Sequence, residues 1–276
     1  MKISASIVLF NTNEEMLDRV INSFNPNSEN KILFLLDNSP VRSKYSFNNS
    51  YNIEYIFNGQ NLGYGTAHNV ALKMAIQQNY DYHIVLNPDL YFKSEIVDEL
   101  NTFMENNTDT VYVLPNVVYP DGELQCLCKK LPTPFNMFLR RFLPKIGLLK
   151  KVDDDFSLKK SGYDKIINPP CLSGCFMFLR LSAIRDMNLF FDDRFFMYYE
   201  DFDLIRRCHR IGKTAFYPHV TITHNHARQA YTSVRMLLIF GMSTIKYFNK
   251  YGWFFDRERK MMNQKIDIEI AELVRN

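Results

Sequence analysis

Residues 65–89 read GTAHNVALKMAIQQNYDYHIVLNPD, and this stretch decides the fold. Apolar residues recur three or four positions apart over residues 65–79, which predicts a helix with one buried side. Residues 83–86 form a short apolar run that predicts a buried strand, and residues 87–89 end it, because Asn, Pro and Asp favour turns. A helix followed by a buried strand and a polar turn is the repeating unit of an α/β domain.

The sequence before this stretch repeats the unit. Apolar, β-rich runs predict strands at residues 3–10, 31–36 and 51–58, and residues 14–24 predict a helix. Because strands alternate with helices, we expect a mostly parallel, Rossmann-like central sheet that is flanked by helices on both faces.

The second half of the chain is less regular. Residues 120–168 are punctuated by proline and rich in basic and aromatic residues, and we interpret them as an acceptor-side insertion or a mobile segment. The later predicted elements are a buried strand at 171–179, a helix at 201–211 that stops at Gly212, a strand at 214–223, and a mainly helical end at 230–276.

The composition excludes several classes of protein. The 276 residues are 46% hydrophobic, enough for one large core, and the net charge of +3 gives no reason to expect nucleic acid as a partner. The five cysteines include no CxxC pair, so we expect free thiols and a reducing compartment. The sequence has no signal-peptide pattern and no run of about 18 apolar residues, which predicts a cytoplasmic protein.

Basic and aromatic residues are interleaved between residues 129 and 151. The cations are Lys129, Lys130, Arg140, Arg141, Lys145, Lys150 and Lys151. This mixture suits an anionic membrane surface or an anionic ligand, and it equally suits a solvated helix face.

Polar loops follow three predicted strands, at residues 10–12, 37–39 and 87–89, and ligands of parallel sheets bind where such loops converge. Asp89 stands just beyond a buried strand, where its carboxylate can bind a divalent ion that also binds a diphosphate. A turn of this composition is also common for conformational reasons alone. His224 follows a later β-run, and its imidazole can complete such a metal site, although lone histidines have many other roles.

Three carboxylates, Glu200, Asp201 and Asp203, lie at the expected start of a helix. Acids at that position cap the helix and interact favourably with its dipole, but one acid is enough for this purpose. Three acids after the aromatic residues of 190–196 fit a general base in a partly desolvated pocket.

Residues 61–69 read NLGYGTAHN, a loop with two glycines at the start of a predicted helix. Backbone amides at a helix start can face phosphate or ribose. The loop is neither a P-loop nor a GxGxxG fingerprint, so its spacing alone does not identify a ligand.

In chain order, these motifs resemble the family 2 glycosyltransferases, in particular the bacterial rhamnosyltransferase-like branch that builds surface polysaccharides. The resemblance runs from about residue 4 to residue 232. The matching segments are FN at 10–11, DNS at 37–39, NLGYG at 61–65 continuing to Asn69, NPD at 87–89, SGCFM at 173–177, FFMYYEDFDL at 195–204, and His224. The resemblance implies a GT-A fold and transfer of a sugar from a nucleotide diphosphate to a hydroxyl group.

The resemblance also implies a role for each matching residue. Asp201 would be the catalytic base, with Glu200 and Asp203 as supporting acids, and Asp89 and His224 would bind Mg²⁺ or Mn²⁺. The residues expected to bind the nucleotide sugar are Phe10, Asn11, Asp37, Asn38, Asn61, Gly63, Asn69 and Asn87. Three features depart from the family pattern. Asn87 stands where the DXD-type motif begins with an acid, residues 225–229 replace a glycine-rich stretch, and Asn188 and Leu189 replace a glycine-rich turn.

The reaction implied is a single displacement with inversion at the anomeric carbon. We expect dTDP-rhamnose as the donor, with a UDP-hexose as the alternative, and a glycan acceptor that a lipid anchor would place near the basic segment of 129–151. The expected location is the inner face of the bacterial plasma membrane, with peripheral contact. The sequence leaves the oligomeric state open.

We expect a catalytic domain over residues 1–230 and a C-terminal helical extension over residues 231–276. Within the first, a nucleotide-sugar half spans about 1–115, a variable membrane-proximal segment about 120–168, and an acceptor and catalytic half about 169–230. A nucleotidyltransferase would carry a basic, glycine-rich loop near its N-terminus, and residues 10–20 contain one basic residue and no glycine. A non-catalytic sugar-binding protein, in which the acids merely cap helices, is the remaining alternative.

Overall fold

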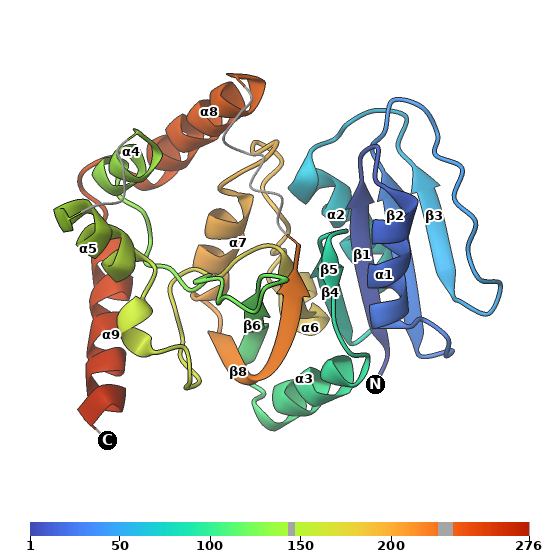
Figure 1. The fold of residues 1–276 in the computed structure, drawn as a ribbon, viewed down its shortest axis with the longest axis horizontal. Helices are drawn as coiled ribbons and strands as arrows, with labels where there is room; N and C mark the ends of the chain where they lie inside the picture. The colour runs from blue at the N-terminus through green and yellow to red at the C-terminus, as the bar shows by residue number, and fades with distance from the viewer. Residues whose placement is uncertain (143–146, 226–233, 276) are drawn as a thin grey trace.

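The computed structural model describes residues 1–142, 147–225 and 234–275. Its sheet has eight strands, in the order β3-β2-β1-β4-β7-β6-β8-β5 (Figure 1). The strands are β1 (Ile3–Leu9), β2 (Lys31–Asp37), β3 (Ile53–Phe57), β4 (Tyr82–Leu86), β5 (Leu90–Tyr91), β6 (Thr110–Val118), β7 (Phe176–Arg180) and β8 (Lys213–His224). The helices are α1 (Glu14–Phe24), α2 (Tyr64–Gln77), α3 (Glu95–Asn106), α4 (Pro134–Phe142), α5 (Gly147–Phe156), the 3₁₀ turn η1 (Lys159–Ser161), α6 (Leu181–Asp186), α7 (Glu200–Cys208), α8 (Val234–Tyr251) and α9 (Arg257–Arg275).

The N-terminal half contains the parallel sheet that the sequence predicts. β1 pairs in parallel with β2 and with β4, and β2 pairs in parallel with β3. β4 and most of β2 are buried without a break, as strands covered on both faces should be. The α/β fold class is therefore confirmed: α1 forms the crossover from β1 to its neighbour β2, and α2 connects β3 to β4 on the other side of β1.

Beyond β4 the sheet is mixed, and one predicted strand is shorter than expected. β7 runs antiparallel to β4 and β6, while β8 runs parallel to β6. We predicted a strand over residues 171–179, but β7 begins only at Phe176. The preceding residues form a loop because the carbonyls of Ser173 and Gly174 accept hydrogen bonds from tyrosine hydroxyl groups of other elements.

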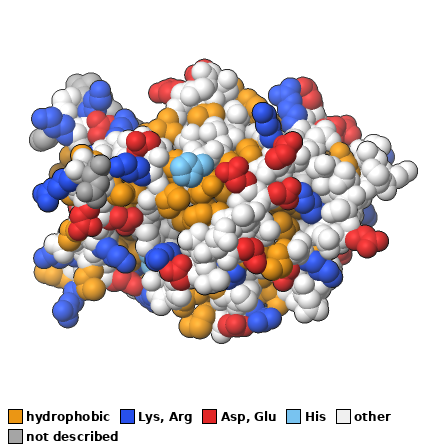
Figure 2. Space-filling model, turned by 90° about the horizontal axis from the view of Figure 1, so that it is seen from below, with side chains coloured by type: hydrophobic (Ala, Val, Ile, Leu, Met, Phe, Trp, Pro, Cys, Tyr) orange, Lys and Arg blue, Asp and Glu red, His pale blue; other side chains and the backbone are white. Residues whose placement is uncertain are grey.

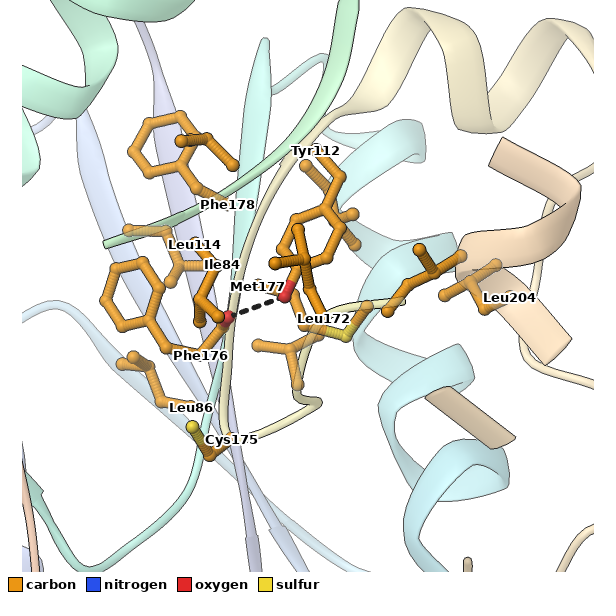
Figure 3. Close-up of a cluster of buried hydrophobic side chains, with 14 of the residues drawn as sticks. Ile84, Leu86, Tyr112, Leu114, Leu172, Cys175, Phe176, Met177, Phe178 and Leu204 are labelled. Atoms are coloured by element: carbon orange, nitrogen blue, oxygen red, sulfur yellow. Dashed lines mark hydrogen bonds between the residues drawn. The ribbon is translucent and has the colours of Figure 1, made fainter. Parts of the chain in front are cut away.

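A core under this loop fixes its position (Figure 3). Side chains from β4, β6 and β7 pack together, and the Tyr112 hydroxyl lies 2.7 Å from the Ser173 carbonyl and 3.2 Å from the Phe176 carbonyl. Leu172 and Leu204 join the same cluster from the loop and from α7. The core therefore connects the loop before β7 to the helix that carries the predicted acids.

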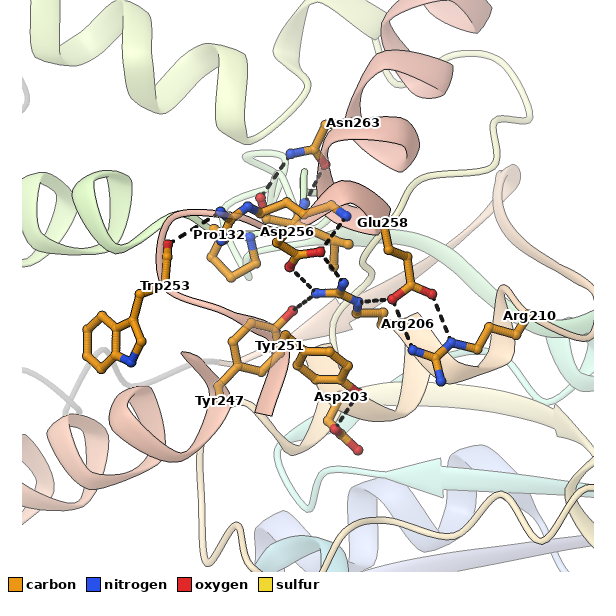
Figure 4. Close-up of polar contacts among 12 residues, drawn as sticks. Pro132, Asp203, Arg206, Arg210, Tyr247, Tyr251, Trp253, Asp256, Glu258 and Asn263 are labelled. Carbon is orange, nitrogen blue, oxygen red and sulfur yellow. Dashed lines mark hydrogen bonds and ion pairs between the residues drawn. The ribbon is translucent and has the colours of Figure 1, made fainter. Parts of the chain in front are cut away.

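The described part of the C-terminal extension, residues 234–275, forms α8 and α9 and is anchored to α7 (Figure 4). Arg206 of α7 is 1% exposed and lies 2.6 Å from Asp256 and 2.7 Å from Glu258. Its guanidinium also lies 4.0 Å from the centre of the Tyr251 ring. The predicted boundary at residue 230 falls outside the described residues.

No helix of the described chain has both the length and the apolar character that crossing a membrane requires. Acidic and basic side chains are interspersed on the face that Figure 2 shows, without a large field of one sign.

Candidate functional site

Asp37, at the carboxyl end of β2, is fully buried. Its carboxylate accepts hydrogen bonds from the amides of Ser39 (2.9 Å) and Ser43 (3.1 Å) and from the Tyr55 hydroxyl. Burial opposes ionisation, but these hydrogen bonds outweigh it and hold the pKa of Asp37 below its ordinary value. Asp37 is therefore a fixed anion that shapes the loop after β2.

Three predicted nucleotide-sugar residues lie together beside this loop. Asn38 Nδ2 lies 3.3 Å from both Asn61 Oδ1 and the Gly63 carbonyl, and Asn61 Oδ1 accepts a bond from the Gly63 amide at 3.0 Å. Gly63 has φ +84°, and a Cβ there would lie 2.4 Å from the Phe196 carbonyl. Only glycine fits this position, because it tolerates both the left-handed backbone and the close approach.

The loop after β1 closes the same edge of the sheet. The Asn11 amide donates to Ser39 Oγ at 2.8 Å, which joins the loops after β1 and β2. Phe10 is half exposed, and Asn11 is exposed with a left-handed backbone. These two side chains form a rim open to solvent.

Asn69 makes a different set of contacts. Its Nδ2 donates to the Phe191 carbonyl at 2.8 Å, and its Oδ1 accepts from the Phe191 amide at 2.9 Å. Both ends of the amide therefore hold the loop before α7 against α2. The predicted contact with the nucleotide sugar stays a prediction.

The structure brings Asp89 and His224 into contact. Asp89 immediately precedes β5, which pairs with β8 so that Leu90 lies opposite His224. His224 Nε2 lies 3.2 Å from Asp89 Oδ1 and 3.4 Å from Asn87 Nδ2. Two residues from distant parts of the sequence thus form a carboxylate–imidazole pair.

Gln125 orients this imidazole, a role that no motif of the sequence predicts. Gln125 Oε1 lies 3.0 Å from His224 Nδ1, and Gln125 Nε2 donates to the His224 carbonyl at 2.8 Å. Because Gln125 Oε1 holds Nδ1 of the His224 ring, the other ring nitrogen, Nε2, is directed toward Asp89. Burial disfavours the charged imidazole, but hydrogen bonds with Asp89 and Cys175 outweigh it and raise the pKa of His224 to about 10.

The pair fits a divalent cation that is shared with a ligand. Among the described residues, no group of three or more His, Cys, Asp or Glu side chains is arranged to hold a metal. Mg²⁺ sites, however, commonly combine one or two protein ligands with phosphate oxygens and water, and Mn²⁺ accepts the same ligand types. Since a metal ligand must be deprotonated, an ion bound here would displace the proton that His224 shares with Asp89.

Tyr64 connects this pair to the predicted base. Its hydroxyl lies 3.0 Å from Asn87 Oδ1 and 2.6 Å from the Gly174 carbonyl. The Gly174 amide in turn lies 3.3 Å from Asp201 Oδ2. Sequence reasoning placed Tyr64 inside a motif but gave it no role, because its partners lie far away in the chain.

The three acids of α7 have different environments. Asp201 is partly buried, and its Oδ1 also accepts a bond from the Phe202 amide at 2.8 Å. Glu200 is buried, and its Oε2 has no hydrogen-bond partner among the described residues. Asp203 faces away from this pair and binds Arg207, Lys250 and Tyr251.

These environments affect the pKa values of the adjacent acids Glu200 and Asp201 differently. Burial raises the pKa of Asp201, and the nearby charge of Lys129 opposes that rise. Burial and then the charge of Asp201 raise the pKa of Glu200 to about 8. At neutral pH we therefore expect Glu200 to be protonated and Asp201 to carry the charge, as a general base requires.

A protein-family model described as glycosyl transferase family 2 matches residues 4–184, more than half of the chain. The chain belongs to this family. The predicted family is confirmed, and the rhamnosyltransferase-like branch within it stays a prediction. The match ends before Asp201 and His224, so the assignment of these two residues depends on the contacts described above.

One curated relative supports the same class of enzyme. The chain is 26% identical over 178 residues to the low-salt glycan biosynthesis hexosyltransferase Agl10 of Haloferax volcanii. The alignment covers 64% of this chain and 52% of Agl10. The chain therefore spans about half the length of this relative.

Solved structures of S. aureus TarS share the fold. The crystal structure of TarS has a TM-score of 0.55 at 15% identity and covers 90% of this chain and 40% of that chain. TarS 1-349 in complex with UDP-GlcNAc has a TM-score of 0.54 at 14% identity, with coverage of 90% and 67%. The GT-A fold that the resemblance implied is thus confirmed.

Proposed function

We propose that this protein transfers a sugar from a nucleoside diphosphate sugar to a hydroxyl of a glycan acceptor, with inversion at the anomeric carbon. The observation that carries the proposal is the contact path from Asn87 through Tyr64 and Gly174 to Asp201. This path supports the proposal, because it links the proposed base to Asn87, which lies 3.4 Å from His224 of the proposed metal site. A helix-capping role for the acids would not require Asp201 to be linked to that site.

Donor binding is assigned to the loops after β1, β2, β3 and β4 and to the first turns of α2. The proposed contacts are the predicted ones: Phe10, Asn11, Asp37, Asn38, Asn61, Gly63, Asn69 and Asn87. The interlocking bonds of Asn38, Asn61 and Gly63 support this assignment, because a preorganised polar loop loses little entropy on binding.

Asp89 and His224 are the proposed ligands of Mg²⁺ or Mn²⁺. The ion, when bound, supplies positive charge to the departing nucleoside diphosphate. Because Asn87 replaces an acid, the protein offers one anionic ligand, and we expect tight metal binding only together with the diphosphate.

Asp201 is the proposed catalytic base. Its carboxylate takes the proton of the acceptor hydroxyl while that oxygen attacks the anomeric carbon. The bond between the anomeric carbon and the phosphate oxygen breaks, and the nucleoside diphosphate leaves with the bonding electrons. Glu200 supports the base by staying neutral, and Asp203 supports it by holding α7 in place.

The donor sugar is a finer proposal. The motif resemblance favours dTDP-rhamnose. The TarS complex with UDP-GlcNAc and the printed name of Agl10, a hexosyltransferase, support a UDP-hexose or UDP-N-acetylhexosamine as the second candidate.

We also retain the proposed organisation of the chain and its location. Residues 1–230 form the catalytic domain, 231–276 form the extension, and the enzyme works peripherally at the cytoplasmic membrane on a lipid-linked glycan. The basic segment of 129–151 gives partial support, because only some of its cations are available to a membrane. Lys130 and Arg140 form ion pairs with Asp155 and Asp153. Lys150 and Lys151 are exposed. Lys145 lies outside the described residues.

Incubation with a panel of nucleotide sugars tests the proposal. Mass spectrometry should detect release of nucleoside diphosphate from one donor in the presence of Mn²⁺ or Mg²⁺, and loss of that release with a chelator. A donor that binds by calorimetry but is never turned over, with any acceptor glycan offered, would favour the non-catalytic sugar-binding alternative.

A further inference from the structure

The outer side of α8 is apolar and exposed. Val234, Leu238, Met242 and Ile245, which we call the α8 stripe, are three or four residues apart and each more than half exposed. This spacing places them on one side of the helix, while Tyr247 and Phe248 on the other side are buried in the core. An exposed contiguous apolar surface of this kind marks an interaction site.

The turn between α8 and α9 continues the apolar surface. Phe254 is 81% exposed and Phe255 is 97% exposed, although Phe side chains are among the most often buried. The buried Arg259 guanidinium holds the turn through the carbonyls of Phe254, at 3.3 Å, and Pro132, at 3.2 Å. Three residues beyond Pro132 in the chain, Phe135 of α4 is a further exposed apolar side chain.

The charges around this surface are strongly cationic. Residues 234–261 contain six Lys and Arg and two acids, Asp256 and Glu258. Both acids are bound to Arg206, so neither offsets the surface cations. The exposed cations that remain include Arg235, Arg257 and Lys260.

The α8 stripe adjoins the loop that leads to the catalytic helix. Ser243 Oγ donates to the Met197 carbonyl at 2.8 Å, and an open groove of about 550 Å³ separates Phe196 from Leu238 and Met242. The Phe196 carbonyl accepts a bond from the Tyr64 amide at 3.0 Å. A surface bound to the stripe would therefore lie beside the loop that leads to α7 and Asp201.

We propose that the α8 stripe and the Phe254–Phe255 turn bind the surface of an anionic lipid bilayer. Exposed Phe and Leu side chains with flanking Lys and Arg are what an interfacial helix requires. A second copy of the chain fits less well, because a two-fold interface would bring the same cations together. The proposal concerns membrane binding and does not depend on the transfer reaction.

Trp253, the only tryptophan of the chain, precedes the two exposed Phe residues and reports on the contact. With vesicles of phosphatidylcholine and phosphatidylglycerol, we expect co-sedimentation and a blue shift of the Trp253 emission. Vesicles of phosphatidylcholine alone should bind at least about tenfold more weakly, and added salt should weaken the binding to the anionic vesicles.

Paired variants test whether membrane binding depends on this surface or on exposed apolar side chains in general. The double variant Phe254→Ser/Phe255→Ser should lower the partition coefficient at least about tenfold, because two fully exposed apolar rings are removed. The matched control Met187→Ser/Val274→Ser removes exposed apolar side chains elsewhere and should bind as the wild type does. Arg257→Gln/Lys260→Gln should remove much of the preference for phosphatidylglycerol. Circular dichroism melts confirm that each variant is folded.

Three results would overturn the proposal. They are a wild-type protein that binds neither vesicle, a Phe254→Ser/Phe255→Ser variant that binds as tightly as the wild type, and a concentration-dependent dimer that this variant abolishes. The last result would assign the surface to a second copy of the chain. All three are measured without substrate, so they are distinct from a failure of the transfer assay.

Discussion

At the residue scale, two adjacent acids, Glu200 and Asp201, have different surroundings, and burial raises the pKa of both. Asp201 accepts hydrogen bonds from two backbone amides, whereas Glu200 is enclosed with one oxygen lacking a partner among the described residues. Backbone amides favour the charged form and burial favours the neutral form. The assignment of Asp201, and not Glu200, as the base follows from this difference.

The buried Glu200 gives a prediction about stability and pH. Its pKa is about 8 in the folded protein against an ordinary value of 4.5, so the folded state binds the proton more tightly. Between these two pH values the unfolded state loses its proton first, and the free energy of unfolding should fall as pH rises. Glu200→Gln should remove this fall and exceed the wild type in stability at pH 8 by a few kcal/mol at most. Urea titrations at pH 5 and pH 8 measure the free energy of unfolding of both proteins. If it changes with pH by the same amount in the wild type and in Glu200→Gln, the prediction is wrong.

Tyr64 is predicted to be a positioning residue. Tyr64→Phe removes the hydroxyl between Asn87 and Gly174, so we expect kcat to fall about tenfold while the donor KM changes little. The matched control is Tyr51→Phe, whose hydroxyl binds Asn22 at the surface and should leave kcat unchanged. A rise in KM without loss of kcat would instead make Tyr64 a donor-binding residue.

Asp89 is predicted to link metal to donor. Asp89→Asn should remove the gain in donor affinity that Mn²⁺ provides, because an amide is a weaker ligand than a carboxylate. Isothermal calorimetry with and without Mn²⁺ measures this gain, with the exposed Asp98→Asn as control. Equal gains in the wild type and in Asp89→Asn would remove Asp89 from the metal site.

Single residues were predictable from the sequence only where a motif contains them. Asp89, Asp201 and His224 stand in motifs, and the structure brings the first and last into contact. Gln125 could not be found in this way, since its bond to His224 depends on packing between β8 and a loop 99 residues earlier. Asn69 is the opposite case: a motif contains it, but in the structure its side chain binds the backbone of Phe191 and so holds the loop before α7.

At the element scale, α7 joins the predicted base to the C-terminal helices. Its first turn carries Asp201, and its last turn carries the buried Arg206 that binds Asp256 and Glu258. Asp203 adds a bond to Tyr251 of α8 at 2.7 Å. The extension is therefore bonded to the helix that carries the proposed base.

Arg206→Ala should be strongly destabilising. The substitution leaves the buried Asp256 without its partner, which typically costs about 3–5 kcal/mol. Arg210→Ala is the matched control on the same helix, because Arg210 also binds Glu258 but is half exposed, and it should cost less than about 1 kcal/mol. Chemical denaturation compares the two, and equal effects would contradict the buried-anchor role of Arg206.

The predicted elements were most accurate where the hydrophobic pattern was continuous. Residues 14–24 form α1 as predicted, and β1, β2 and β4 lie within a residue or two of their expected bounds. Sequence reasoning did not identify β6, whose interior contains Pro115. Proline cannot donate a ladder hydrogen bond, and the register of β6 with β8 shifts at that residue.

At the scale of the whole molecule, two halves of the sheet meet at the site. The parallel half supplies the loops with Asp37 and Asn61, and the mixed half supplies Asp201 and His224. The order of the motifs along the chain predicted the family, because each loop follows a strand that the fold places at one edge. The connections between the halves, through Tyr64 and Gly174, depend on tertiary packing that no local pattern records.

The transfer rate of Asp201→Asn tests the account most directly. With saturating donor and metal, we predict that the rate of acceptor glycosylation falls by about 10²–10⁴, since general base catalysis contributes that much, while the Kd for the donor stays within about twofold of wild type. Quenched-flow measurement of product, with calorimetry for the donor, gives both numbers. A folded Asp201→Asn protein that glycosylates the acceptor at nearly the wild-type rate would contradict the assignment of Asp201 as the base.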